Sequence, residues 1–145
     1  MAASIRILIV DDFEPWRRFL CSYLQPFPEW KIIGQASDGL EAVEKSRELQ
    51  PDLILLDVGL PKLNGIEAAR QIQRICPRSR ILFLSEECCP EIVNAALNVG
   101  GLGYVVKSDV AADLVTALRA VIANKQFIGS GIPSSDAPSA DSELP

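Results

Sequence analysis

The stretch Ile5-Arg6-Ile7-Leu8-Ile9-Val10-Asp11-Asp12 decides the fold, because it is an apolar run that ends in two adjacent carboxylates. A second apolar run, Leu53-Ile54-Leu55-Leu56, ends in Asp57. Runs of this kind are typical of strands that are buried on both faces of a parallel sheet. The carboxyl ends of such strands meet at one edge of the sheet, where α/β proteins bind their ligands. We therefore expect the three aspartates at a common edge.

The size and composition of the chain predict one globular domain. It has 145 residues, of which 48% are apolar, and this is enough to bury a substantial core. No apolar stretch approaches the ~20 residues of a membrane span, and the first residues lack the pattern of a signal peptide. We expect a cytoplasmic protein that does not interact with membranes.

Charge and cysteine content argue against two further classes of site. The formal net charge is -5 and no strong basic cluster is present, so we expect no direct nucleic-acid binding by this chain. The four cysteines lack the C-x-x-C spacing of zinc or redox sites, and the chain has no histidine. The adjacent pair Cys88-Cys89 is not expected to form a disulfide in a reducing cytosol.

Hydrophobic periodicity predicts five alternating strands and helices. The expected strands are 5–10, 31–36, 52–57, 80–85 and 103–107, and the expected helices are 14–25, 38–49, 64–75, 90–99 and 109–123. Because short connections and right-handed crossovers place helices on both faces, this alternation predicts a doubly wound α/β fold of the flavodoxin-like type. Its five-stranded parallel sheet has the expected order 2-1-3-4-5.

The composition changes near residue 129. Residues 129–145 are rich in Ser, Pro, Ala, Gly and acidic side chains, and they have few large apolar groups to offset the entropy cost of ordering. We expect a domain over residues 4–128, followed by a disordered tail or linker over 129–145. No second domain is expected within these residues.

The polar residues at four strand ends predict a particular chemistry. In the expected order, the strands that precede Asp11-Asp12 and Asp57 are neighbours, and three carboxylates that close repel one another unless a hard cation binds them. The fourth strand ends in Ser85 and the fifth in Lys107. A metal site, a carboxylate nucleophile, a cation and a hydroxyl donor at one edge suit phosphoryl transfer onto a carboxylate, with Mg²⁺ and the lysine neutralising charge.

The sequence resembles the response-regulator receiver domains of two-component signalling over residues 4 to about 128. The resemblance rests on Asp11-Asp12, on Ser85 and on two longer motifs, Asp57-Val58-Gly59-Leu60-Pro61-Lys62-Leu63-Asn64-Gly65 and Gly103-Tyr104-Val105-Val106-Lys107-Ser108. It implies that a sensor histidine kinase phosphorylates Asp57 and that the domain relays this by a conformational switch. Such a protein is a signalling receiver, which promotes only its own phosphorylation and dephosphorylation and is not an enzyme in the usual sense.

The resemblance also assigns roles to individual residues. It implies that Asp12, Asp57 and the backbone carbonyl of Gly59 ligate Mg²⁺, and that Asp11 acts mostly through a metal-bound water. Lys107 would pair with the phosphoryl group, Ser85 would move to hydrogen-bond it, and Tyr104 would swing inward behind Ser85. The ordinary structural alternative for Tyr104, a half-buried aromatic residue at an edge strand, stays open.

The end of the fifth predicted strand is most like the subfamily that carries a LuxR/NarL-type helix-turn-helix output domain. The basis is Lys107-Ser108 without a following proline, preceded by Gly100-Gly101-Leu102-Gly103-Tyr104. This chain ends before any such domain, so a role in transcription regulation is implied only by likeness. The face formed by residues 90–99, 103–107 and 109–123 would change on phosphorylation, and it is a candidate surface for homodimer formation.

Two alternatives are left open by these residues. Glu86 follows Ser85 where the family usually has a small residue, and Glu87 adds a second charge, which allows a degenerate receiver that acts as an unphosphorylated interaction module. A flavodoxin-like enzyme on the same fold is disfavoured, since FMN binding calls for an anion cradle after the first strand and Asp11-Asp12 is acidic there. An aspartate-nucleophile phosphatase would have an acid at position 59, where this chain has glycine.

Overall fold

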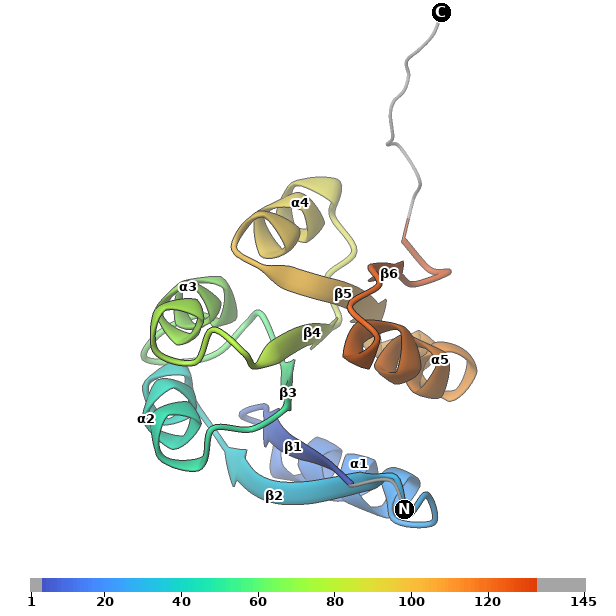
Figure 1. Ribbon diagram of the computed structural model, residues 1–145. Helices are drawn as coiled ribbons and strands as arrows, with labels where there is room; N and C mark the ends of the chain where they lie inside the picture. Colours follow the sequence, from blue (N-terminus) through green and yellow to red (C-terminus); the bar gives the residue numbers. More distant parts are fainter. Residues whose placement is uncertain (1–3, 133–145) are drawn as a thin grey trace, which may run out of the picture.

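The computed structural model describes residues 4–132, which form a three-layer α/β/α arrangement (Figure 1). A single parallel sheet has the strand order β2-β1-β3-β4-β5-β6. Its strands are β1 (Ile5–Val10), β2 (Trp30–Ala36), β3 (Leu53–Leu56), β4 (Arg80–Ser85), β5 (Gly101–Val106) and β6 (Phe127–Ile128). The predicted flavodoxin-like fold and the order of the first five strands are confirmed.

Helices cover both faces of the sheet. They are α1 (Glu14–Leu24), α2 (Gly39–Leu49), α3 (Gly65–Ile75), α4 (Pro90–Asn98) and α5 (Val110–Ile122), and a 3-10 turn, η1 (Lys107–Asp109), links β5 to α5. The apolar residues of α2, α3 and α4 belong to one core cluster, and those of α1 and α5 belong to the other. The sheet therefore separates two cores, as expected when crossover connections alternate between its faces.

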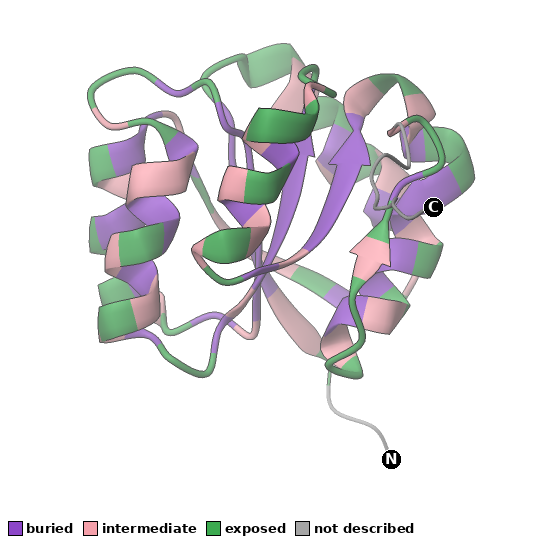
Figure 2. Ribbon diagram, turned by 90° about the horizontal axis from the view of Figure 1, so that it is seen from above, coloured by how far each residue is buried: buried purple, intermediate pink, exposed green. Residues whose placement is uncertain are grey.

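Burial follows the hydrophobic pattern of the sequence. All four residues of β3 are buried, because this central strand is covered on both faces. Figure 2 shows buried residues along the strands and on the sides of the helices that face them. Two helices begin at side-chain caps: Asp38 accepts a hydrogen bond from the Glu41 N–H, and Asn64 accepts one from the Glu67 N–H. These caps fix the loops that lead into α2 and α3.

A sixth strand corrects the prediction of five. Phe127 and Ile128 pair in parallel with Gly103 and Tyr104 at the open edge of β5. The segment continues against the domain, since the Gly129 N–H donates to the Tyr104 carbonyl and Ile132 packs against the core beside α4. The first residues of the predicted tail, 129–132, are thus packed on the domain. The rest of that predicted tail, residues 133–145, lies outside the described residues.

Each helix within residues 4–132 is too short or too polar to cross a bilayer.

Candidate functional site

Three carboxylates meet where β1 and β3 end. The two strands are neighbours, with Val10 opposite Leu56, so that Asp11 and Asp57 leave the sheet side by side. One carboxylate oxygen from each of Asp11, Asp12 and Asp57 lies within 4.8 Å of the others. Asp11 and Asp57 are buried, and Asp12 is exposed. The three carboxylates that were expected at one edge of the sheet therefore do lie close together.

Asp11 is held by its own loop. Its Oδ1 accepts a hydrogen bond of 2.9 Å from the Phe13 N–H, and the Arg17 guanidinium donates one of 2.6 Å to its backbone carbonyl. Its Oδ2 is buried and, among the described residues, accepts no hydrogen bond of good geometry, although Lys107 lies close to it. A buried carboxylate oxygen beside an ammonium and two further carboxylates fits a site that binds cations.

Lys107 supplies the positive charge of the site. It is the first residue of η1, and its Nζ lies 2.6 Å from Asp11 Oδ2 and 3.4 Å from Asp57 Oδ2. Burial alone would lower the pKa of the Lys107 ammonium, but the contacts with the two carboxylates outweigh it and raise that pKa. The ammonium is therefore charged at neutral pH and bridges the two buried acids.

Asp57 lies in a tight loop that orients its carboxylate. Burial raises the pKa of the Asp57 carboxyl, Lys107 opposes this shift, and the charge of Asp11 adds to it. Gly65 packs directly on the Asp57 backbone, where a Cβ on Gly65 would overlap the Asp57 carbonyl oxygen. The Gly65 N–H also donates a hydrogen bond of 2.7 Å to the Val58 carbonyl. Only glycine fits at position 65, which gives the glycine at the end of the Asp57–Gly65 motif a structural reason.

A small polar cavity of about 240 Å³ lies over the acids. Its walls include Gly59, Ser85, Glu86 and Glu87 in addition to the carboxylates and Lys107. A Cβ added to Gly59 would have no neighbouring atom within 4 Å, so that the space beside this residue is open. The carboxylate oxygens of the cluster suit a hard divalent cation such as Mg²⁺.

Ser85 and Tyr104 are linked through one residue of the β4–α4 loop. The Ser85 Oγ accepts a hydrogen bond of 3.2 Å from the Glu87 N–H, and the Tyr104 hydroxyl donates one of 2.8 Å to the Glu87 carbonyl. The ring of Tyr104 is fully buried and stacks on Phe83. Burial raises the pKa of Tyr104 to about 12. In this structure Tyr104 thus occupies an inward position, rather than a half-buried one at the edge.

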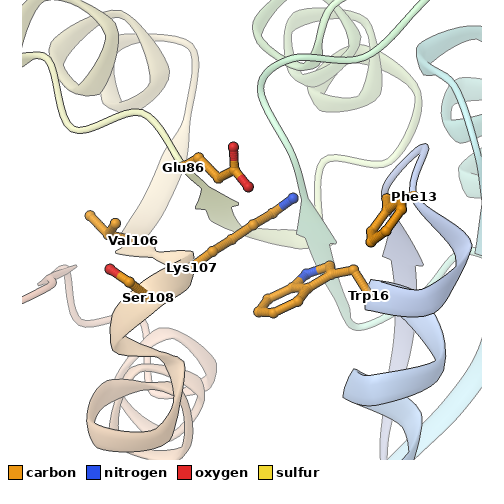
Figure 3. A pocket seen from close by; sticks show the side chains of 6 residues that line it. All are labelled: Phe13, Trp16, Glu86, Val106, Lys107 and Ser108. Carbon is orange, nitrogen blue, oxygen red and sulfur yellow. The ribbon is translucent and has the colours of Figure 1, made fainter.

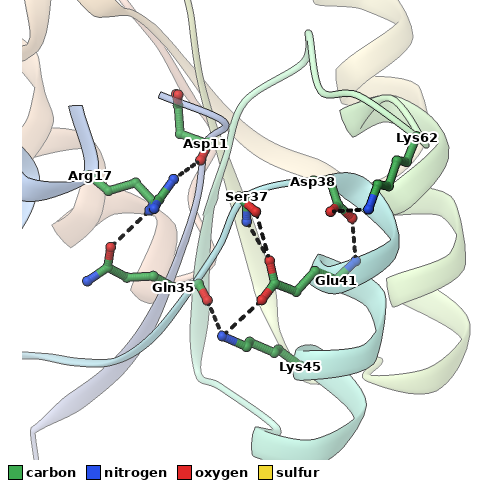
Figure 4. Close-up of polar contacts among 8 residues, drawn as sticks. All are labelled: Asp11, Arg17, Gln35, Ser37, Asp38, Glu41, Lys45 and Lys62. Carbon is green, nitrogen blue, oxygen red and sulfur yellow. Dashed lines mark hydrogen bonds and ion pairs between the residues drawn. The ribbon is translucent and has the colours of Figure 1, made fainter. Parts of the chain in front are cut away.

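The loop after β2 forms a second polar network, on the α2 side of the acids (Figure 4). Glu41 accepts a hydrogen bond from the Ser37 N–H at 2.8 Å, and Lys62 forms an ion pair with the Asp38 cap at 3.5 Å. Arg17 connects this network to the site, since it donates to Gln35 as well as to the Asp11 carbonyl. These contacts hold the loops beside the acids in place.

Sequence reasoning missed one contact of the site. The Lys107 Nζ lies 5.3 Å from the centre of the Trp16 ring, and both residues line a cavity of about 480 Å³ that adjoins the acids. Figure 3 shows Lys107 reaching across this cavity, with Phe13 and Trp16 on the α1 side and Glu86 opposite. Trp16 belongs to an apolar stripe at helical spacing, and that pattern does not distinguish a core residue from one beneath a cation.

Comparison with known proteins identifies the family. The sequence profile described as "Response regulator receiver domain" matches residues 7–119. The chain belongs to this family. It is 38% identical over 116 residues to the transcriptional regulatory protein LiaR of Bacillus subtilis, a match that covers 80% of this chain and 55% of LiaR. The response regulator protein VraR of Staphylococcus aureus is 35% identical over the same length.

Solved structures agree with this assignment. A LuxR-family two-component response regulator from Aurantimonas sp. SI85-9A1 matches with a TM-score of 0.85 and 32% identity, over 90% of this chain and 93% of that one. The response regulator domain of Thermotoga maritima CheB matches with a TM-score of 0.78 and 34% identity, over 83% and 98%. The predicted receiver family and its LuxR/NarL-type likeness are confirmed. The chain spans about half the length of the curated relatives it matches.

Proposed function

We propose that this receiver accepts a phosphoryl group on Asp57 from a sensor histidine kinase and transmits that event through a change of conformation. The observation that carries the proposal is the position of Asp57 between Lys107, at 3.4 Å, and two further carboxylates at the same edge of the sheet. Carboxylates this close, with one bridging ammonium, form a site that favours added cations and then an anionic phosphoryl group.

The chemistry assigned to the residues is a single displacement. A carboxylate oxygen of Asp57 attacks the phosphorus of a phosphorylated histidine, the new P–O bond forms, and the P–N bond breaks with its electron pair going to the imidazole nitrogen. Lys107 neutralises charge on the phosphoryl oxygens, for which its ammonium already lies within reach of Asp57. Asp11, Asp12, Asp57 and the Gly59 carbonyl would hold Mg²⁺, which supplies further charge neutralisation when bound.

The assigned switch uses Ser85 and Tyr104. A phosphoryl group on Asp57 adds negative charge and acceptor oxygens, so the state in which Ser85 and Lys107 contact it gains charge-assisted hydrogen bonds. Ser85 has a hydroxyl proton to donate, since the contact with Glu87 uses it only as an acceptor. A shift of Ser85 changes the position of Glu87 and therefore of the Tyr104 hydroxyl. The α4, β5 and α5 face is the proposed surface for self-association.

The intact mass of the protein tests the proposal. After incubation with Mg²⁺ and a small phosphodonor such as acetyl phosphate, we expect a gain equal to one phosphoryl group, and no gain for Asp57→Asn. Absence of any gain in the unsubstituted protein would favour the degenerate receiver, a role that the exposed acids Glu86 and Glu87 beside the cavity leave open. A gain that persists in Asp57→Asn would place the phosphoacceptor elsewhere.

A further inference from the structure

Lys107 must hold its ammonium in a defined place for its proposed role, yet its side chain has four rotatable bonds. The ammonium lies 2.6 Å from Asp11 Oδ2 and 3.4 Å from Asp57 Oδ2, so that both of its anionic partners are in the acidic cluster. Phosphorylation of Asp57 changes the charge on that side. A partner that does not belong to the cluster would keep the ammonium in place while its anionic contacts are exchanged.

Trp16 is such a partner. The Lys107 Nζ lies 5.3 Å from the centre of the Trp16 ring, within the distance at which a ring face attracts a cation. The indole has no formal charge, so it does not compete with phosphoryl oxygens as a carboxylate does. Among the described residues the Trp16 Nε1 is buried without a hydrogen-bond partner, so that no hydrogen bond of the indole explains its position.

The ring of Trp16 belongs to a row of stacked aromatic rings on α1. It stacks on Phe19 with 5.2 Å between ring centres, and Phe19 stacks on Tyr23 at 5.7 Å. The Tyr23 hydroxyl then donates to the Ala111 carbonyl, near the start of α5. Lys107 lies in η1, directly before α5, so this row of aromatic rings connects α1 to the segment that carries the lysine.

We propose that Trp16 is a positioning residue for Lys107, with its ring face keeping the ammonium near Asp57 before and after phosphoryl transfer. Trp16 acts through Lys107 and does not touch the reacting atoms. This inference rests on the proposed function, because it concerns the rate at which Asp57 accepts a phosphoryl group.

A double-mutant cycle tests the inference. The rate of phosphorylation by acetyl phosphate with Mg²⁺ is measured by intact mass for Trp16→Leu, Lys107→Met and the double variant. We expect Trp16→Leu to slow the reaction about five- to tenfold, the range expected for a partly desolvated cation and ring. In the Lys107→Met background the same change should alter the rate by less than about twofold. Equal effects in both backgrounds would overturn the inference, since they would indicate a purely structural role.

Further variants separate folding effects from positioning. Trp16→Phe keeps a ring face and is expected to retain most of the rate. Trp30→Phe changes the other tryptophan, which is buried in the core at the start of β2. In Trp30→Phe, Trp16 is the remaining tryptophan, so its fluorescence should change when Lys107→Met removes the ammonium from the ring face. An unchanged rate in Trp16→Leu contradicts the inference. Failure of the unsubstituted protein to be phosphorylated would instead contradict the proposed function.

Discussion

The Tyr104 hydroxyl donates a hydrogen bond of 2.8 Å to the backbone carbonyl of Glu87. The same loop residue donates its N–H to Ser85, so that the two proposed switch residues are joined through one peptide segment. The buried ring of Tyr104 therefore holds the β4–α4 loop over the acidic cavity. Any displacement of Ser85 toward Asp57 has to move or break this connection.

Tyr104→Phe should remove this connection and keep the ring. We expect a loss of about 1 kcal/mol in the free energy of unfolding at neutral pH, because the Glu87 carbonyl loses its donor. Hydrogen exchange of residues 86–89 should become faster. The matched control is Tyr23→Phe, the other tyrosine of the chain, whose hydroxyl bonds to Ala111 in an exposed position. Slower or unchanged exchange in Tyr104→Phe would contradict the prediction.

Alkaline pH should act on the same residue. The pKa of Tyr104 rises from 10.0 to about 12 on folding, so the folded state keeps the phenol proton more tightly than the unfolded state. The stability that the protonated Tyr104 hydroxyl contributes is complete below pH 10 and is lost as the pH approaches 12. By about pH 11 the unsubstituted protein should therefore lose ~1 kcal/mol more than Tyr104→Phe does. Urea unfolding at a series of pH values measures this difference, and parallel curves would exclude it.

Asp57→Asn should stabilise the protein in the absence of divalent ions. Because burial first and Asp11 second raise the pKa of the Asp57 carboxyl, with only partial opposition from Lys107, its ionised form costs stability at neutral pH. We expect a gain of about 1 kcal/mol at neutral pH in the presence of EDTA, a typical size for one substitution. The gain should shrink as the pH falls toward the ordinary carboxyl value of 3.8. Urea unfolding at both pH values checks the sign, and Asp52→Asn is a control outside the acidic cluster.

Mg²⁺ should raise the unfolding midpoint of the unsubstituted protein. A ligand that binds only the folded state adds about 2.7 kcal/mol at a concentration of one hundred times its dissociation constant. Asp12→Asn should weaken this effect, since it removes one carboxylate of the cluster while the buried pair with Lys107 remains. Thermal unfolding with increasing MgCl₂ measures the shift, with NaCl of equal ionic strength as the control. A midpoint that does not respond to Mg²⁺ would remove the metal from the proposed mechanism.

Glu86→Ala should accelerate phosphorylation by an anionic donor. The Glu86 side chain is exposed and lines both cavities, so its charge opposes the approach of acetyl phosphate. We expect a rate increase of about two- to fivefold at low salt, typical of one exposed charge, and a smaller increase at high salt. Glu48→Ala, on α2, removes a charge that does not line either cavity. If rate and phosphoryl lifetime are both unchanged in Glu86→Ala, Glu86 is only a solvated loop residue.

The order of the first five strands could be predicted because the βα alternation and right-handed crossovers leave few arrangements. The same logic brought Asp11, Asp57 and Lys107 to one edge, since each directly follows a buried strand. The position of Tyr104 could not be predicted, because one aromatic residue at a strand is compatible with either orientation. The contact between the Trp16 ring and Lys107 could not be predicted either. An apolar helical stripe has the same sequence pattern whether its residues lie in the core or line the cavity.

The strand β6 was missed for a different physical reason. A two-residue strand has no measurable period, and Phe127–Ile128 is recognisable only by its pairing with the edge of β5. The residues after it have the composition of a linker, yet the Ser130 N–H and hydroxyl both donate to the buried Asp113 carboxylate at 2.9 Å. Side-chain contacts with α5 therefore hold a segment whose composition alone predicts disorder.

Asp113→Ala should release this segment. Asp113 is the acceptor for both Ser130 donors. Its loss leaves the pairing of β6 with β5, the Gly129–Tyr104 hydrogen bond and the packing of Phe127 and Ile132. We expect hydrogen exchange of residues 127–132 to become about tenfold faster, since the two hydrogen bonds from Ser130 to the Asp113 carboxylate are removed. Thr116→Ala, at an exposed position of the same helix, is the matched control. Exchange that stays as slow as in the control would show that β6 pairing and apolar packing hold the segment without Asp113, whereas acceleration spread over the whole domain would mean that Asp113 stabilises α5 itself.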